Sequence, residues 1–250
     1  MPNLMINDED YINKICSLLK TVEQTEKSSM AKASRLIYAS LKSGGLLHVF
    51  STGHSHMIVE EMFYRAGGLI PINPILDDSL MLHKGAITST QNERIPGKAT
   101  EVLQKAGLKA GDSIIISSNT GINAVPVEAA LYAKSCGVSV ICVTSLESTM
   151  HLTSRHDQGR KLYQVSDIVI DNHSPLGDGA MVVPINGQIT GGTSTFSSLF
   201  IAQRIVLMVE NLYLAEGLTP PIFMSANVPG GDEFNEKVAY YYKGLIQSLW

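Results

Sequence analysis

The chain has 250 residues, of which 44% are hydrophobic and 17% charged, a composition typical of a folded globular protein. Its net charge of -4 argues against a nucleic-acid-binding surface, which would show clustered lysine and arginine residues. No stretch approaches the roughly 20 apolar residues that a membrane span needs, so we expect neither nucleic acid nor a membrane as a partner.

The N-terminal part of the chain is predicted to be helical. Residues 1–10 are polar and lack the apolar segment of a signal peptide. Over residues 8–42 apolar side chains recur at helical spacing, and Gly44-Gly45 ends this pattern, which predicts one or two helices. The three cysteines have no metal-ligand spacing, which is typical of a protein in the reducing cytoplasm.

A first strand-loop-helix junction follows. Residues 46–50 form a continuous apolar run and predict a strand. A loop rich in hydroxyl and imidazole groups comes next, Ser51-Thr52-Gly53-His54-Ser55-His56. Residues 55–66 predict a helix, with Ser55 as its N-cap and Gly67-Gly68 as its end.

The segment between the two junctions is less regular. Residues 69–75 predict a short strand, and the two prolines in it indicate a position at the edge of a sheet. Residues 77–97, which contain Glu93, show no clear periodicity, and residues 98–107 predict a helix.

A second junction repeats the pattern of the first. The strand over residues 114–116 leads into Ser117-Ser118-Asn119-Thr120-Gly121-Ile122-Asn123, and a helix is predicted over residues 124–136. Both loops place hydroxyl and backbone N–H groups at the positive end of a helix, an arrangement that binds anions and most often phosphate. Neither loop contains GxxxxGK[ST] or GxGxxG, which argues against a nucleotide or dinucleotide site.

The rest of the chain continues the alternation of strands and helices. The remaining strands are expected over residues 138–143, 167–170 and 181–185, and the remaining helices over residues 193–215 and 233–249. Continuous apolar strands that alternate with helices predict a parallel, doubly wound sheet covered on both faces. No linker is evident, so we expect one domain over residues 1–250, with a helical segment 8–43, a core 45–215 and a C-terminal loop and helix 217–249.

Three segments of the chain resemble the sugar isomerase (SIS) domain family. They read HVFSTGHS from residue 48, DSIIISSNTGINAVPVEAALYAKSCGVSVICVTS from residue 112, and SDIVIDN from residue 166. The resemblance runs from about residue 35 to 215. The segments SRHDQGRKL and DNHSPLGDGA are similar to those of stand-alone bacterial SIS proteins, which are often labelled phosphoheptose isomerases or left uncharacterised.

This resemblance implies a flavodoxin-like α/β/α sandwich with a five-stranded parallel sheet. It also implies a phosphosugar at the carboxyl ends of the strands, no cofactor, and a homodimer or homotetramer with sites near the subunit interface. In the second loop Asn119 and Asn123 stand where the family often has hydroxyl residues. The implied phosphate contacts are Ser117, Ser118, Asn119, Thr120 and Asn123, and the implied sugar contacts are Ser51, Thr52, Gly53, Ser55 and His56.

Aldose–ketose isomerisation requires a base that moves a proton between adjacent carbons and groups that shuttle protons to the sugar oxygens. The candidate catalytic residues near the two loops are Glu60, Glu61, Glu93, His54 and His173. For Glu60 and Glu61 the alternative is a solvated helix face, whereas His48, inside a strand, is expected to be a hydrogen-bonded core residue. The pair His54 and His56 has no third ligand at metal-binding spacing, so we expect no metal.

The leading hypothesis is therefore an isomerase of a sugar or aminosugar phosphate. An alternative is a lyase similar to N-acetylmuramic acid 6-phosphate etherases, whose reaction also begins with proton abstraction beside a carbonyl. A second alternative is a phosphosugar sensor without turnover. The 35–45 residues before the first strand are too few and too weakly basic for an added DNA-binding domain.

Overall fold

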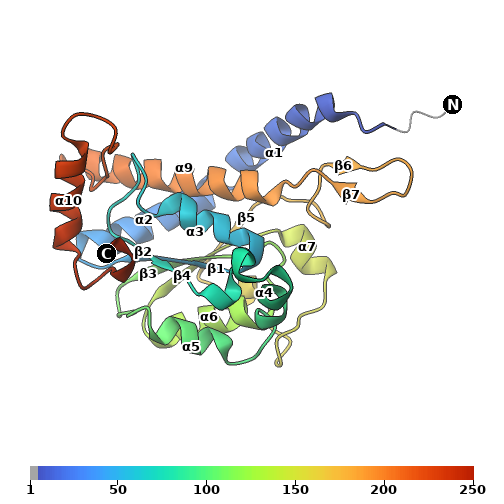
Figure 1. The fold of residues 1–250 in the computed structure, drawn as a ribbon, viewed down its shortest axis with the longest axis horizontal. Helices are drawn as coiled ribbons and strands as arrows, with labels where there is room; N and C mark the ends of the chain where they lie inside the picture. Colours follow the sequence, from blue (N-terminus) through green and yellow to red (C-terminus); the bar gives the residue numbers. More distant parts are fainter. Residues whose placement is uncertain (1–4) are drawn as a thin grey trace.

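A five-stranded parallel sheet forms the centre of the computed structural model, which describes residues 5–250 (Figure 1). The first four residues of the polar N-terminal segment therefore lie outside the described residues. The strand order is β2-β1-β3-β4-β5, and all neighbours are parallel. The strands are β1 (Leu47–Ser51), β2 (Ile72–Ile75), β3 (Ser113–Ser117), β4 (Ser139–Thr144) and β5 (Ile168–Asp171). The predicted fold class is confirmed, and β2, which contains Pro74, lies at the edge as its prolines indicated.

Helices cover both faces of the sheet, because each strand carries apolar side chains on both sides. On one face Val49, Ile115 and Ile141 pack against α1 (Tyr11–Thr25), α2 (Lys27–Lys42), α3 (Met57–Met62) and α9 (Ser194–Ala215). On the other face Phe50, Ile114 and Val140 pack against α5 (Lys98–Gln104), α6 (Ala124–Ser135) and α8 (Leu162–Val165). Figure 1 shows α9 running along the first layer and α5 and α6 beneath the sheet.

Within residues 5–250 one helix, α9, is by length and composition capable of crossing a membrane, with a mean hydropathy of 1.3 over its most apolar window. The core helix of a globular protein has the same properties, and Ile201, Ile205 and Val209 of α9 are fully buried in the first core cluster. The apolar character of α9 is thus explained by its packing against the sheet and α2.

The other elements surround this sandwich. They are α4 (Ala86–Asn92), α7 (Leu146–His151), α10 (Gly231–Tyr241), β6 (Met181–Val182), β7 (Ile189–Thr190) and the 3₁₀ turns η1 (Asp8–Asp10), η2 (Gly53–His56), η3 (Asp78–Leu80), η4 (Leu82–Lys84) and η5 (Gln247–Leu249). The strand expected over residues 181–185 is only two residues long, and it pairs antiparallel with β7 in a hairpin outside the main sheet.

Two predicted helices have different boundaries in the structure. The helix expected over residues 55–66 covers only Met57–Met62, because residues 53–56 form the 3₁₀ turn η2 and Phe63 is extended. The N-cap prediction for Ser55 is wrong, since His56 holds that position without a side-chain cap. The final helix ends at Tyr241 instead of residue 249. Gly244 beyond it has a φ of +85°, which a right-handed helix does not accommodate.

A buried polar network joins three elements at the amino-terminal half of the sheet. His48 in β1 is fully buried, with Nε2 3.0 Å from Asp112 Oδ2 and Nδ1 3.0 Å from Asn73 Nδ2. Asp112 also accepts hydrogen bonds of 2.9 Å from the backbone N–H groups of Leu46 and Lys109. Burial by itself would raise the pKa of Asp112, but these hydrogen bonds lower it below its ordinary value. The expectation that His48 is a satisfied core residue is confirmed.

Candidate functional site

The two loops predicted to bind an anion lie side by side. Ser51 at the end of β1 is in register with Ser117 at the end of β3, so both loops begin at the same edge of the sheet. The hydroxyl of Ser51 donates a hydrogen bond of 2.6 Å to the carbonyl oxygen of Ser117. The carboxyl edge between two such neighbouring strands is where doubly wound folds bind their ligands.

Glu93 connects the two loops. It follows α4 directly, and its carboxylate accepts hydrogen bonds from Thr52 Oγ1 at 2.8 Å and from Asn123 Nδ2 at 2.7 Å. The Glu93 carbonyl oxygen accepts the N–H of Val125, in the first turn of α6, at 3.1 Å. Arg155 donates to Asn123 Oδ1 at 2.9 Å, which orients the Asn123 amide group toward Glu93.

The Glu93 carboxyl is largely buried, which makes its ionised form less stable than that of an exposed glutamate. Burial raises the pKa of this carboxyl above its ordinary value, against the opposing effects of the Thr52 hydrogen bond and the charges of Arg94 and Arg155. A carboxylate with a raised pKa is a stronger base once ionised, and general bases act best when their pKa lies near the working pH. The geometry and the pKa of Glu93 together suit proton abstraction.

Four helices begin near the loops at this edge, namely α3, α6, α7 and α9, and at two of them carboxylates accept the first N–H groups. At α9, Asp178 accepts the N–H groups of Thr193 at 3.1 Å and Ser194 at 2.7 Å. At α7, the N–H of Leu146 donates to Asp171 at 3.1 Å, and Ser145 supplies a side-chain cap. The starts of α3 and α6 have no side-chain cap, although the N–H of Val125 in the first turn of α6 donates to the Glu93 carbonyl. In the loop before α6, the N–H groups of Asn119 and Thr120 donate no hydrogen bond within residues 5–250.

The second loop is held so that these N–H groups face away from β4 and α7. The Asn119 carbonyl accepts from the N–H of Ser145 at 2.9 Å, and the Thr120 carbonyl accepts from Thr149 Oγ1 at 2.5 Å. Because C=O and N–H of a trans peptide unit point in opposite directions, the N–H of Thr120 is directed outward. Gly121, at a φ of +60°, lies where a Cβ would come within 3.0 Å of Thr144 Oγ1. Free backbone N–H groups that point outward from a loop are the kind of group that binds anions in proteins.

Three other predicted catalytic residues, Glu60, Glu61 and His173, make no hydrogen bond to the two loops. Glu61 pairs with Arg65 and accepts from Gln203 of α9 at 2.8 Å. The Glu60 side chain is 58% exposed, with Oε1 3.6 Å from Nε2 of His56 in the first loop. His173 lies 2.8 Å from Thr25 Oγ1 and 3.5 Å from Glu26, between β5 and the junction of α1 and α2. Of the predicted catalytic groups, only Glu93 hydrogen-bonds to residues of both loops.

The first-loop histidines have different surroundings. His54 is exposed and, with Ser55, lines a small groove against Ser194 and Ser198 of α9. His56 is buried, and neither ring nitrogen has a hydrogen-bond partner in the described chain. Burial lowers the pKa of His56 below its ordinary value, against the opposing effect of Glu60. Within residues 5–250, no three His, Cys, Asp or Glu side chains are grouped so as to hold a metal ion.

Asn172 was not among the residues predicted from the sequence. Its Nδ2 donates to Asn119 Oδ1 at 3.0 Å and to Ser198 Oγ at 3.3 Å, so it ties the second loop to α9. Asn172 follows the carboxyl end of β5, where ligand-binding residues of such sheets are expected. The position after β5 could have indicated Asn172 as a site residue from the sequence. It indicates the adjacent His173 equally, and imidazole is the more common acid–base group.

Asp178 provides a test of the α9 start. Replacing Asp178 with alanine is expected to lower the free energy of unfolding by about 1–2 kcal/mol, because the N–H groups of Thr193 and Ser194 lose their acceptor. Burial would raise the pKa of Asp178, but hydrogen bonds from Ser194, Ser174 and Thr193 lower it below 3.8. The stabilisation is thus present above pH 3.8 and disappears as the pH falls through the folded-state pKa.

Urea unfolding of both proteins at neutral and acidic pH measures this effect, with Asp157→Ala in an exposed loop as the control. If the free energies of unfolding of wild type and the Asp178 variant differ by the same amount at both pH values, ionised Asp178 does not stabilise the start of α9.

Comparison with known proteins identifies the family. A family model described as "SIS domain" matches residues 10–145, more than half of the chain. The chain belongs to the SIS domain family. A UPF0309 protein of Geobacillus thermodenitrificans is 39% identical over 246 residues, which is 96% of this chain and 97% of the relative. A UPF0309 protein of Halalkalibacterium halodurans is 41% identical over 244 residues, 96% of each.

Solved structures of SIS proteins share the fold. The phosphoheptose isomerase GmhA of Neisseria gonorrhoeae is 14% identical, covers 82% of this chain and 95% of its own, and superposes with a TM-score of 0.52. An Escherichia coli protein solved in complex with a sugar phosphate is also 14% identical, covers 82% of this chain and 89% of its own, and has a TM-score of 0.51. At these identities the likeness concerns the sheet and its helices, not the site residues.

Proposed function

We propose that this SIS protein binds a sugar or aminosugar phosphate in the cytoplasm and isomerises it between aldose and ketose. The observation that carries the proposal is the Glu93 carboxylate, which accepts hydrogen bonds from Thr52 of the first loop and from Asn123 of the second, the loop that also holds the free N–H groups of Asn119 and Thr120. The phosphate would bind to the N–H groups of Asn119 and Thr120 and to the Thr120 hydroxyl. The solved SIS relatives, a phosphoheptose isomerase and a complex with a sugar phosphate, support this substrate class.

In the proposed reaction Glu93 acts as the base. Its carboxylate takes the proton from C2 of the open-chain aldose phosphate, and the electrons of the C–H bond form the C1=C2 bond of an enediol while O1 gains a proton. The enediol then loses the O2 proton and regains a proton from Glu93 at C1, which yields the ketose phosphate. His54, exposed on the first loop, is the proposed carrier of the proton between O1 and O2.

Two measurements test this proposal. A thermal-shift screen against sugar phosphates, with the free sugars as controls, detects binding because a ligand of the native state raises Tm by mass action. Deuterium exchange at C2 in heavy water then detects proton abstraction. Binding with exchange supports the isomerase, and binding without exchange indicates a phosphosugar sensor. Absence of any phosphate-dependent shift would overturn the proposal.

The phosphate site makes a separate prediction. Replacing Thr120 with valine is expected to weaken phosphosugar binding by about tenfold or more, because a hydrogen bond to a charged group contributes about 1.5–3 kcal/mol. Valine keeps the shape of threonine, and the Thr120 hydroxyl has no partner in the described chain, so Tm of the free protein should be unchanged. Calorimetric titration measures the affinity, with the exposed Thr219→Val as the control. Equal affinities of the two variants would contradict this role of Thr120.

We also propose a homodimer or homotetramer. In Figure 1 α1 and the β6–β7 hairpin extend beyond the body on the same side. The exposed apolar side chains of this region include Ile12 at 63%, Val182 at 54%, Ile185 at 75% and Phe196 at 49%. Exposed apolar patches of this kind favour a protein interface. Light scattering coupled to gel filtration would measure the mass, and a monomer at micromolar concentration would overturn this part of the proposal.

A further inference from the structure

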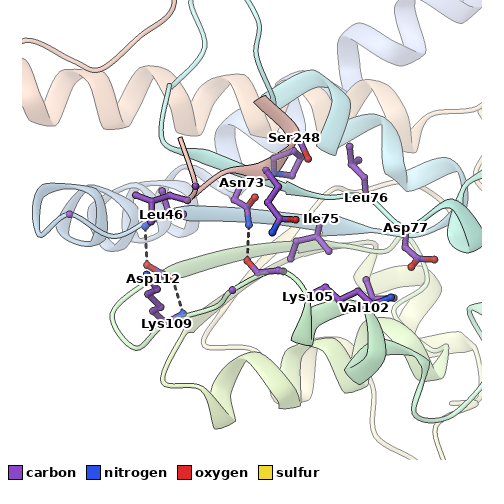
Figure 2. Close-up of a pocket in the computed structure, with 17 residues that line it drawn as sticks. Leu46, Asn73, Ile75, Leu76, Asp77, Val102, Lys105, Lys109, Asp112 and Ser248 are labelled. Carbon is purple, nitrogen blue, oxygen red and sulfur yellow. Dashed lines mark hydrogen bonds between the residues drawn. The ribbon is translucent and has the colours of Figure 1, made fainter. Parts of the chain in front are cut away.

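A cavity of about 340 Å³ lies along the outer edge of β2, away from the loops of the candidate site (Figure 2). Its walls are the strand segment 73–77, the end of α5 with the turn that follows, and the C-terminal residues 244–248. None of the residues 51–56, 93 or 117–123 lines it. Its volume is within the range of small-molecule pockets in proteins, so it is large enough for a second ligand.

The charged side chains that line the cavity differ in whether they have hydrogen-bond partners in the chain. Asp112 accepts three hydrogen bonds, from Leu46, His48 and Lys109, and Asp77 accepts the N–H of Ser79 at 3.0 Å. By contrast, the ammonium groups of Lys105 and Lys109 have no hydrogen-bond or ion-pair partner within residues 5–250. The two carboxylates thus accept hydrogen bonds from the chain itself, whereas Lys105 and Lys109 are exposed and their charges are accessible to an anion.

The remaining walls of the cavity are uncharged and can contact the carbon skeleton of a small organic ligand. Ile75 and Val102 offer buried apolar surface, and Asn73 is 6% exposed, with its Nδ2 engaged by His48 and by the Ala106 carbonyl. The C-terminal segment that closes one side is anchored by Ile246, which is fully buried. Figure 2 shows side chains of β2, α5 and the C-terminal segment around the same space.

We propose that this cavity is a second ligand site, for a small metabolite whose phosphate or diphosphate group is attracted by the positive charges of Lys105 and Lys109. Such a ligand would also contact the segment that leads to Glu93. Asp77 caps η3, whose Ser79 carbonyl accepts Asn92 Nδ2 at 2.8 Å, and Asn92 directly precedes Glu93. The site does not depend on the proposed isomerase activity, since it uses none of the residues assigned to it.

Titration of the full-length protein with inorganic pyrophosphate, followed by amide NMR shifts, tests this proposal. Binding in the cavity is expected to shift the signals of Gly107 and Gly244, which line it, at lower concentrations than those of Thr120 and Gly121. The double variant K105A/K109A should weaken this binding by about tenfold or more. The variant K20A/K32A, which removes two exposed lysines from α1 and α2, is the matched control and should leave it unchanged.

Shifts confined to Thr120 and Gly121 would overturn the cavity proposal while supporting the phosphosugar site. Equal weakening by both double variants would also overturn it, because pyrophosphate would then be responding to net charge alone. The absence of shifts at Gly107 and Gly244 would likewise overturn the cavity proposal. Because separate amides report the two sites, failure of either proposal can be distinguished from failure of the other.

Discussion

Replacing Glu93 with glutamine is expected to lower the rate of C2 proton exchange in the phosphosugar substrate by about 10²–10⁴-fold, the usual contribution of a general base. Glutamine has the shape of glutamate but cannot accept the proton. Its carbonyl can still accept from Asn123 Nδ2, and its NH₂ group can donate to the Thr52 hydroxyl, so the local structure should persist. Phosphosugar affinity, measured by titration, should change little.

The pH dependence gives an independent signature. Burial raises the pKa of Glu93 above 4.5, so the wild-type rate should fall as the pH decreases through this raised pKa, where the base becomes protonated. A raised pKa also means that ionised Glu93 costs stability above pH 4.5, and the glutamine variant should therefore be at least as stable at neutral pH.

The matched control is Glu101→Gln on α5, whose side chain is 70% exposed and which should retain the full exchange rate. An unchanged rate in the Glu93 variant would show that another group is the base. A lost rate together with a lower Tm would instead indicate that Glu93 has a structural role.

The substitution Asp112→Ala is expected to lower the free energy of unfolding by about 3 kcal/mol or more, because each buried donor that loses its acceptor costs about 1–3 kcal/mol. It would leave His48 Nε2 and the N–H groups of Leu46 and Lys109 without an acceptor in the protein interior. Urea unfolding at neutral pH measures the loss. Because the pKa of Asp112 is lowered in the folded state, the difference should shrink as the pH falls below 3.8.

Asp78→Ala is the control for this prediction. The Asp78 carboxylate forms a surface ion pair with Lys84 at 3.1 Å, and its side chain is 74% exposed. Surface pairs of this kind contribute about 0–1 kcal/mol. Similar losses for the two variants would show that the network of Asp112 is no more stabilising than an exposed pair.

The sheet could be predicted because its signals are local. Continuous apolar runs such as residues 114–116 indicate buried strands, and glycines after them mark where helices end. The prolines of residues 69–75 were enough to predict the edge position of β2. The two hydroxyl-rich loops could be predicted for the same reason, since each directly follows such a strand. The small error at Ser55 arose because residues 53–56 form a 3₁₀ turn.

The choice among the candidate carboxylates could not be predicted in this way. The sequence places three glutamates, Glu60, Glu61 and Glu93, near the two loops. In the structure Glu61 contacts Gln203 and Arg65. Glu93 instead accepts hydrogen bonds from Thr52 and Asn123. Thr52, Glu93 and Asn123 are far apart in sequence. Their contact depends on how residues 77–97 pack on the start of α6. The same holds for Asn172, which reaches Asn119 and Ser198 only through the order of the strands.

By itself the sequence determined the strand-helix alternation, the edge position of β2 and the two loops that could bind an anion, because hydrophobic periodicity and turn residues act over a few neighbouring positions. Only the tertiary structure decided which helix starts are occupied by carboxylates and which carboxylate meets both loops. The reason is that Asp178 and Asp171 occupy the starts of α9 and α7 through contacts between loops that the folded sheet brings together.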